Sequence, residues 1–345
     1  MENNTPPTVS VIIPVHNGRH TFPHCLASVA EAIHAPHEVI VVGDGVGHEY
    51  DDLLAHYGFR YLKLDTCQGA ARARNVGAQV AAGDVLFFLD SDVTVPGDVL
   101  QQVLAVFQDE PDVDALIGSY DDAPSETNFL SQYKNLFHHY VHQNSSEEAS
   151  TFWGACGAIR RKVFWQLDGF DTDYQRATIE DIELGYRLRD AGSHIKMVKS
   201  LQVKHLKRWE TASFLRTEVF DRALPWVQLI WQNRKLINDL NLEMTSRLST
   251  IFVFGLLLSL VVTLFSWHVT ILPLILFAAG LLWLNRGLYR FFWRRHNFWF
   301  AVQTIPWHWF YYLYSGLAFA LGTIHYVSQN SLPSQYPSQS VALDQ

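Results

Sequence analysis

The feature that most constrains this chain is an apolar run that stops abruptly at acidic residues. Val85 to Leu89 carry no polar side chain, which is typical of a strand buried on both faces of a parallel sheet. Asp90-Ser91-Asp92 follows directly. Ligands of open α/β sheets bind just beyond the carboxyl ends of the strands, and alternate residues of an extended segment point the same way. Asp90 and Asp92 therefore suit Mg²⁺ or Mn²⁺ bridging a diphosphate, although an acidic turn after a strand has the same pattern.

A segment rich in small residues and arginine precedes this strand. Gly69 to Ala78 reads as a helix that carries Arg72 and Arg74. We expect it to bring these guanidinium groups towards the same edge of the sheet. Arginine binds phosphate in a bidentate manner, so this helix fits a phosphate-bearing ligand beside the two aspartates.

Taken together, these motifs resemble those of the family 2 glycosyltransferases, over roughly Val9 to Trp209. The resemblance implies a GT-A fold, which is a Rossmann-like, mostly parallel α/β sheet that binds a nucleotide-sugar. The alternation of apolar and helical segments agrees with a right-handed doubly wound sheet. We expect strands at residues 9–15, 38–42, 61–64, 85–89, 115–119 and 195–203, and helices at 22–33 and 96–108.

The resemblance also predicts a nucleotide site. Asp44 would accept a hydrogen bond from the nucleobase; the family usually has two acidic residues before the glycine, whereas here the first is Gly43, so the base stays open. A solvated Asp44 in a glycine-flanked turn is the alternative. The residues expected to bind the nucleotide-sugar, a UDP- or GDP-sugar, are Pro14, Asn17, Asp44, Arg72, Asn75, Asp90 and Ser91.

Two later segments predict the catalytic base and the acceptor side. Trp153-Gly154 resembles the family's acceptor-side strand, with a glycine-rich core strand as the alternative. Glu180-Asp181 opens a predicted helix, where the helix dipole favours carboxylates and capping alone would explain them. By resemblance, Asp181 is the base that deprotonates the acceptor hydroxyl and Glu180 supports it.

The segment His205-Leu206-Lys207-Arg208-Trp209 has the spacing of the QxxRW motif of processive polysaccharide synthases, with histidine in place of glutamine. We assign Arg208 and Trp209 to the acceptor side. His205 is expected to join Asp90 and Asp92 at the Mg²⁺ or Mn²⁺ ion, or else to be a structural histidine at a strand end. His138, His139 and His142 are interpreted as residues on a helix surface, because no acidic or cysteine partner lies at zinc spacing.

Composition narrows the function classes. The net charge of −8 argues against a nucleic-acid partner, because no global basic surface exists to neutralise phosphates. Cys25, Cys67 and Cys156 are odd in number and widely spaced, which predicts reduced thiols rather than disulfides. The first ten residues lack the pattern of a signal peptide, so we expect a cytoplasmic catalytic domain.

The last third of the chain predicts membrane attachment. Residues 211–238 mix basic and aromatic side chains, and positions 215, 219, 223, 226 and 230 share one helical face. This pattern suits a membrane interface or a helix packed on the domain, and Pro225 should kink or break the helix. The charge-free run from Arg247 to Arg286 is roughly 57 Å long as a helix, so we expect two spans that turn near residues 266–268. A third span is expected at 302–327, with the arginines of 286–295 on the cytoplasmic side.

The expected organisation has five parts. They are a disordered N-terminus (1–8), a catalytic GT-A domain (9–210), an amphipathic interfacial linker (211–247), about three transmembrane helices (248–328) and a polar tail (329–345). The expected function is a metal-dependent, inverting glycosyltransferase of the plasma or inner membrane, acting on a lipid or lipid-linked acceptor. The alternatives are a processive polysaccharide synthase and a catalytically inactive membrane scaffold of the same fold.

Overall fold

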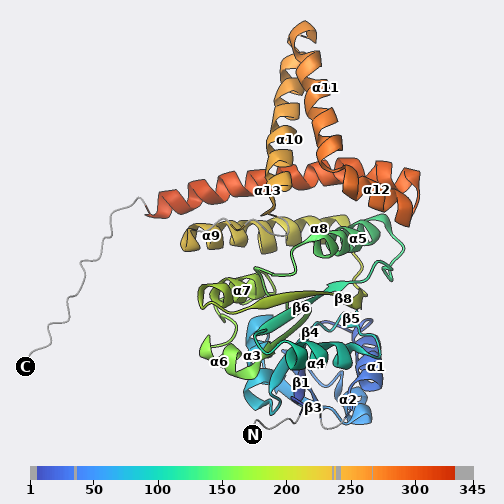
Figure 1. Cartoon of the computed structure of the whole chain (residues 1–345), viewed down its shortest axis with the longest axis vertical. Helices are drawn as coiled ribbons and strands as arrows, with labels where there is room; N and C mark the ends of the chain where they lie inside the picture. The colour runs from blue at the N-terminus through green and yellow to red at the C-terminus, as the bar shows by residue number, and fades with distance from the viewer. Residues whose placement is uncertain (1–5, 35–36, 235–236, 238–241, 266, 331–345) are drawn as a thin grey trace, which may run out of the picture.

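A computed structural model describes residues 6–34, 37–234, 237, 242–265 and 267–330. The chain forms three tiers (Figure 1): an α/β domain, a layer of helices lying across it, and a helical hairpin that projects from that layer. The expected disordered N-terminus and polar tail fall mostly outside the described residues, as does Ser266 in the expected turn between two spans.

The α/β domain is built on one eight-stranded sheet in the order β3-β2-β1-β4-β7-β6-β8-β5. Pairs β1–β2, β1–β4, β2–β3 and β6–β8 are parallel, whereas β7 and β5 run antiparallel to their neighbours. The strands are β1 (Val9–Val15), β2 (Glu38–Asp44), β3 (Arg60–Leu64), β4 (Val85–Leu89), β5 (Val93–Thr94), β6 (Ala115–Tyr120), β7 (Cys156–Arg160) and β8 (Ile195–His205). The expected mostly parallel α/β sheet is confirmed.

Alternate side chains of the central strands enter two different cores, one on each face of the sheet. Val11 and Phe87 pack with α1 (Phe22–Ala32) and α4 (Val99–Asp109), whereas Ile12 and Phe88 pack with α3 (Ala70–Val80), α6 (Arg161–Gln166) and α7 (Glu180–Asp190). A strand covered on both faces has no polar side, which explains why β4 is entirely apolar and β1 has Ser10 as its one polar residue. The short helix α2 (Asp51–Tyr57) packs near α1.

The helical layer joins this domain to the hairpin. It contains α5 (Phe129–Asn144), α8 (Thr211–Arg216), the π-helix η1 (Thr217–Ala223), α9 (Leu224–Asn233), α12 (Arg286–Arg295) and α13 (Phe298–Asn330). Helix α5 packs against β6 on one side, and its Tyr133, Leu136 and Phe137 share a core with residues of α12 and α13 on the other. The layer is therefore attached to the domain through apolar contacts as well as through its connecting segments.

The expected break at Pro225 does not occur. Helical structure continues from Thr211 to Asn233, and the stretch of π-helix lies directly before the proline, which sits in the first turn of α9. Proline lacks an N–H and clashes with the preceding turn of an α-helix. Wider π turns before the proline leave helical structure continuous here, which the amphipathic pattern does not reveal.

The prediction that the histidines of α5 lie on a helix surface is wrong for His139 and His142, which are both buried. His139 Nδ1 lies 2.8 Å from the Tyr120 carbonyl, and His142 Nδ1 lies 3.1 Å from the Gly118 carbonyl. They hydrogen-bond to the backbone of β6, where α5 covers it. A helix face whose polar side chains hydrogen-bond to strand carbonyls has the same sequence pattern as a face exposed to water, so the sequence does not distinguish them.

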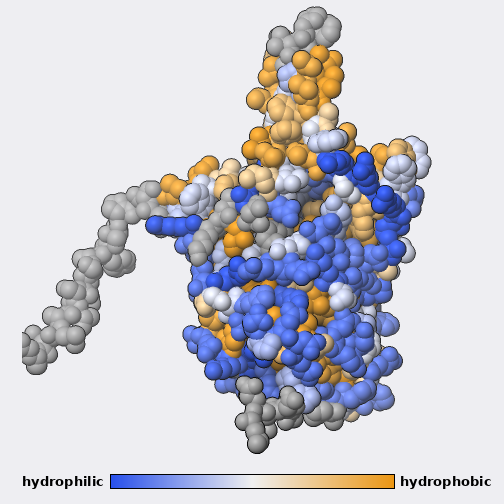
Figure 2. All heavy atoms as spheres, viewed as in Figure 1, coloured by the Kyte–Doolittle hydropathy of each residue, from blue (hydrophilic) through white to orange (hydrophobic). Residues whose placement is uncertain are grey.

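Of the three expected membrane spans, the structure supports one or two by length and composition. Among the described residues, α10 (Met244–Thr263) is long and apolar enough to cross a bilayer, and one bent pair, Ile271–Leu284 of α11 (Trp267–Leu284) with α12, passes the same test with a 60° bend. Helix α13, which contains the expected third span, lies across the base of the α10–α11 hairpin and alongside α9 (Figure 1). The hairpin surface is mostly apolar, whereas the α/β domain is mostly polar (Figure 2).

Candidate active site

The backbone brings Asp92 and His205 together. After β4 ends, the chain turns through Asp90-Ser91-Asp92 into β5, whose Val93 pairs with His205 at the end of β8. The Leu206 N–H donates to the Asp92 carbonyl at 2.8 Å. As a result Asp92 Oδ2 lies 3.6 Å from His205 Nε2, although the two residues are far apart in sequence.

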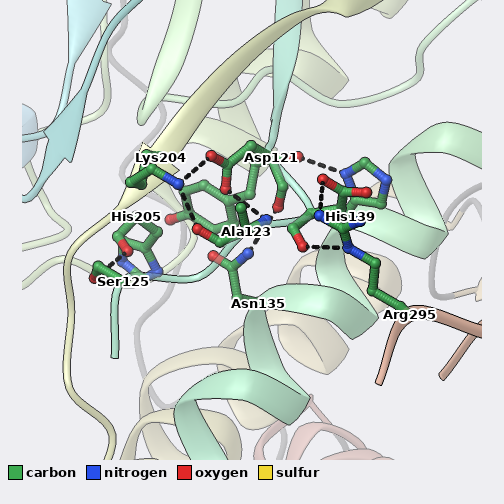
Figure 3. Close-up of polar contacts among 10 residues, drawn as sticks. Asp121, Ala123, Ser125, Asn135, His139, Lys204, His205 and Arg295 are labelled. Carbon is green, nitrogen blue, oxygen red and sulfur yellow. Dashed lines mark hydrogen bonds and ion pairs between the residues drawn. The ribbon is translucent and has the colours of Figure 1, made fainter. Parts of the chain in front are cut away.

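His205 is held in place from two sides. Its ring stacks on Tyr120 with 4.3 Å between centroids and 9° between planes, and Ser125 donates to its backbone carbonyl at 3.0 Å. Figure 3 shows the loop after β6 that carries Ser125. Lys204 binds the Asp121 carboxylate at 2.6 Å, and Arg295 of α12 reaches Asp122 at 2.9 Å. This loop therefore connects the strand end at His205 to the helical layer.

A single buried guanidinium links Asp90 to Glu180. Arg74 Nη2 lies 2.7 Å from Asp90 Oδ1, and Arg74 Nη1 lies 2.8 Å from Glu180 Oε1. The Arg74 side chain is 4% exposed, and its guanidinium lies over Gly154, where an added Cβ would be 2.9 Å from Cζ. Glycine at position 154 thus leaves the space that Arg74 needs to connect the end of β4 to the start of α7.

Asp181 lies beside this bridge and is held by backbone donors. Its Oδ2 accepts from the Gly154 N–H at 3.0 Å, and its Oδ1 accepts from the Ile182 N–H at 2.8 Å. Glu180 also accepts from the Thr178 N–H at 2.8 Å. Both carboxylates open α7, where the helix dipole favours negative charge. The arrangement fixes a carboxylate next to the strand end that bears Asp90.

The carboxylates of the site have different pKa values because their surroundings differ. Burial, followed by the charge of Glu180, raises the pKa of Asp181 to about 6, against the Gly154 N–H and Arg74. Burial also raises the pKa of Asp90 despite Arg74. Burial acts on Asp92 too, but the neighbouring His205 keeps the pKa of Asp92 below its ordinary value. With a pKa of about 6, the Asp181 carboxylate is mostly deprotonated near neutral pH and can accept a proton as a general base.

A divalent ion fits part of this site. Asp92 and His205 present an oxygen and a nitrogen ligand 3.6 Å apart, close enough for one ion with bonds of about 2.0–2.2 Å. Asp90 Oδ1 is bound to Arg74, which leaves its other oxygen for an ion. Among the described residues, His16, Asp44 and Cys67 form a group whose possible ligand atoms all lie within 4.8 Å of one another. The ligand atoms of Asp90, Asp92 and His205 do not meet this distance, so the expected metal site is wider than that group.

The nucleotide residues expected from the sequence divide into two groups. Asp44 is buried rather than solvated, and its carboxylate accepts from the backbone N–H groups of Gln68 at 2.6 Å and Gly69 at 2.9 Å. Asn75 binds both the N–H and the carbonyl of Phe170, so it secures the segment before α7. At the end of β1, Pro14 is buried and Asn17 is exposed, and Ser91 is half-buried between the two aspartates. The assignment of these residues to a nucleotide stays a prediction.

Of the two arginines in α3, it is Arg74 rather than Arg72 that enters the site. Arg72 is exposed, because residues two apart on an α-helix point in nearly opposite directions. A signal for this was present in the sequence: Arg74 shares a face with Ala71 and Ala78, which are buried, and so had to face inward with them.

The acceptor-side residues also separate. The Trp153 ring lies 4.8 Å from that of Tyr120 and 5.1 Å from those of His138 and His142, which places it near the His205 stack. Arg208 is exposed and pairs with Glu126 and Glu210. Trp209 is buried with Phe214 in the core of the helical layer. The structure therefore brings Trp153 and Gly154 to the site, while Arg208 and Trp209 lie at the start of the helical layer.

Comparison with known proteins agrees with this architecture. Residues 10–168 match the family described as glycosyl transferase family 2. A validoxylamine A glucosyltransferase of Streptomyces hygroscopicus subsp. limoneus is 27% identical over 54% of this chain and 49% of its own length. An N-acetylglucosaminyltransferase of Sinorhizobium fredii is 25% identical over 65% of this chain and 61% of its own length. The chain thus spans about half to three fifths of the length of these relatives.

One solved structure extends the likeness to the whole chain at the level of the fold. A mannosyltransferase from Pyrobaculum calidifontis, solved in complex with GDP-Man and Mn²⁺, aligns with 92% of this chain and 88% of its own, with a TM-score of 0.57 and 16% identity. The strand order, the paired acidic strand end and the match over residues 10–168 lead to one conclusion. The amino-terminal part of this chain matches glycosyl transferase family 2, and its fold is like that of the solved mannosyltransferase.

Proposed function

We propose that this protein transfers a sugar from a UDP- or GDP-sugar to an acceptor hydroxyl at a membrane surface, with inversion at the sugar carbon. The observation that carries the proposal is the Arg74 bridge. It ties Asp90, expected at the donor diphosphate, to Glu180, which directly precedes the expected base Asp181. The residues that bind the donor diphosphate and the residues that activate the acceptor would then be connected through one buried side chain, Arg74.

In the proposed reaction, the acceptor O–H bond breaks and Asp181 takes the proton. The acceptor oxygen forms a bond to the anomeric carbon from the face opposite the leaving group, while the bond from that carbon to the nucleoside diphosphate breaks. Gly154 and Ile182 keep Asp181 aimed by their N–H groups, and Arg74 holds Glu180 away from the proton's path. A general base of this kind contributes about 10²–10⁴-fold to the rate.

Asp92, His205 and the free oxygen of Asp90 would hold a Mg²⁺ or Mn²⁺ ion. When bound, such an ion offsets the negative charge on the leaving diphosphate. The mannosyltransferase of similar fold was solved with Mn²⁺, which supports this assignment. Pro14, Asn17, Asp44 and Ser91 are proposed to line the donor site, and Trp153 the acceptor side.

Membrane attachment is proposed from the helical hairpin. Leu258, Leu260 and Leu264 of α10 and the turn after it are more than half exposed, and a lipid environment would cover them. The helical layer lies between this hairpin and the α/β domain (Figure 1), so the domain would lie at the bilayer surface. An acceptor carried by a lipid is the simplest reason for this placement, and a cytoplasmic domain on a plasma or inner membrane fits it.

Two alternatives make different predictions. A processive polysaccharide synthase would release long products, and the histidine in place of the QxxRW glutamine counts against it. An inactive scaffold would bind nucleotide-sugars without turnover.

Release of nucleoside diphosphate tests the proposal. The purified full chain would be incubated with Mn²⁺, membrane lipids and UDP-glucose, UDP-N-acetylglucosamine or GDP-mannose. We expect release with at least one donor, and a loss of about 10²–10⁴-fold in kcat for Asp181→Asn with donor binding unchanged. Asp52→Asn, an exposed carboxylate on α2, is the matched control. No release with any donor, or equal rates in the two variants, would contradict the proposal.

A further inference from the structure

A cavity of about 430 Å³ lies between the helical layer and α10, away from the strand ends described above. Side chains of η1, α9, α10 and α13 line most of it, and most of these side chains are aliphatic or aromatic. Phe254 and Ile251 of α10 form one wall, and Trp226 and Ile230 of α9 contribute to another. A mostly apolar hollow of this size matches a segment of a lipid chain.

The cavity also contains charge, and most of it is positive. Among the described residues, Lys134, Arg222 and Arg247 line it together with one carboxylate, Glu218. Glu218 is buried and lies 2.7 Å from Lys134 Nζ and 3.1 Å from Arg222 Nη1, and it accepts from the Tyr314 hydroxyl at 3.1 Å. The Arg222 side chain stays 41% exposed, so its guanidinium has donors left for a ligand.

Helix α5 connects this cavity to the proposed active site. Lys134 of α5 lines the cavity, and about one helical turn further on His139 Nδ1 lies 2.8 Å from the Tyr120 carbonyl. Tyr120 is the same residue whose ring stacks on His205 beside Asp92.

At its other side the cavity reaches the apolar hairpin. Ile251 and Phe254 line it and belong to α10, the helix that is long and apolar enough to span a bilayer. Ile251 is 62% exposed. Figure 2 shows apolar surface on the hairpin immediately above the helical layer. A lipid chain in the bilayer would thus reach the cavity along α10 without crossing a polar surface.

We propose that this cavity binds the acceptor of the reaction, an anionic lipid whose headgroup carries a phosphate followed by a free hydroxyl. The lipid chain lies among Trp226, Ile230 and Phe254, the phosphate contacts Arg222 and Lys134, and the hydroxyl extends towards Asp181. This inference rests on the proposed function, since it names the acceptor class for the same site. Positive charge between an apolar wall and a carboxylate base selects a lipid with an anionic headgroup over a neutral one.

The bond changes are those of the proposed transfer, with the lipid as acceptor. Its headgroup hydroxyl loses the proton to Asp181 and gains the sugar, while the nucleoside diphosphate leaves with the electron pair of the broken bond. The lipid phosphate keeps all its bonds and serves to position the headgroup.

Selective retention of phosphatidylglycerol, which has both a phosphate and terminal hydroxyls, tests the binding step. The full chain would be reconstituted in nanodiscs of phosphatidylcholine with a minor fraction of phosphatidylglycerol, extracted in detergent and analysed by native mass spectrometry. We expect enrichment of phosphatidylglycerol on the wild-type chain. Arg222→Gln should reduce the enrichment about tenfold, the effect of losing one hydrogen-bonded charge contact. Arg216→Gln, an exposed arginine of α8, is its control.

A second pair of variants tests the lipid chain. Thr250→Trp should fill the cavity and abolish retention, whereas Leu260→Trp on an exposed position of the same helix should not. Binding of UDP and of GDP with Mn²⁺, measured by calorimetry, is followed in every variant as a check of the folded domain. Equal enrichment in wild type, Arg222→Gln and Thr250→Trp would overturn the inference while leaving the glycosyltransferase proposal intact. Selective enrichment without binding of either nucleotide would instead contradict the proposed function alone.

Discussion

At the scale of single residues, Arg74 organises the site more than either aspartate does. It is buried, and it satisfies a carboxylate at the end of β4 and another at the start of α7 at the same time. Taking charges out of water is costly, so such a group is stable only when its partners are in place. The site therefore depends on the complete set of three side chains.

Replacement of Arg74 by glutamine should destabilise the protein strongly. Glu180 would be left with an uncompensated buried charge and the partly exposed Asp90 would lose its partner, at a cost of about 3–5 kcal/mol in the free energy of unfolding. Denaturant titration followed by tryptophan fluorescence would measure this. The control is Arg72→Gln on the exposed face of the same helix, which should change stability by no more than about 0.5 kcal/mol. Similar losses in both variants would show that the bridge is not a stabilising contact.

The pKa of Asp181 makes a second prediction at this scale. Burial and Glu180 raise it to about 6, and only the deprotonated carboxylate can accept a proton. The value of kcat/KM should therefore be constant above this pH and fall about tenfold per pH unit below it. A pH profile of nucleoside diphosphate release measures the acidic limb. The limb should be missing from the residual activity of Asp181→Asn; its persistence there would assign it to another group.

At the scale of elements, much of the α/β domain was predictable because its strands are buried on both faces. The largely apolar runs of β1 and β4 locate those strands at their observed bounds, and the position of Asp90 after β4 locates the ligand edge. The proximity of His205 to Asp92 depends instead on the pairing of a two-residue strand, β5, with β8. Such a short strand has no periodicity of its own, so the expectation that His205 joins Asp92 comes from the place of His205 in the QxxRW-like segment and not from a strand pattern.

Other errors have the same kind of cause. His139 and His142 are polar, and the sequence alone cannot distinguish hydrogen bonds to strand carbonyls from hydrogen bonds to water. Residues 302–327 are apolar enough to suggest a span, yet in α13 they pack along α9, η1, α10 and α12. In both cases the partner comes from a distant part of the chain, which local patterns do not encode.

The α10–α11 hairpin offers a test at this scale. Gly255 of α10 receives the Phe277 ring and Gly280 of α11 receives the Phe252 ring; an added Cβ would lie 2.6 Å and 2.3 Å from them. Gly280→Val should therefore loosen the hairpin by about 1–3 kcal/mol, because the overpacked ring must move. Hydrogen exchange across α10 and α11 in detergent should become faster. Ala279→Val, at an exposed neighbour, is expected to leave exchange unchanged; an equal effect would argue against this packing.

At the scale of the whole molecule, the helical layer determines how the domain meets the proposed membrane. Arg295 of α12 binds Asp122 in the loop after β6, and Ser125 of the same loop donates to the His205 carbonyl. Helix α5 shares one core with α12 and α13. The projecting apolar hairpin and the strand ends are therefore fixed relative to each other through this layer (Figure 1). A lipid acceptor could be presented to Asp181 only if α13 stays on the same side of the bilayer as the domain.

Site-directed labelling distinguishes this arrangement from a third span. In a Cys67→Ser background, Ser328→Cys places a thiol near the end of α13, and Phe265→Cys places one at an 84% exposed position after α10. Vesicles with the catalytic domain outward, identified by labelling of exposed Cys67 in the wild type, are treated with a membrane-impermeant maleimide. We expect Ser328→Cys to react and Phe265→Cys to be protected until detergent is added. Protection of Ser328→Cys would mean that α13 crosses the bilayer, because a helix of 33 residues is long enough to do so. Residues of α13 that line the cavity would then have to leave the helical layer, and the proposed lipid site would lose one of its walls.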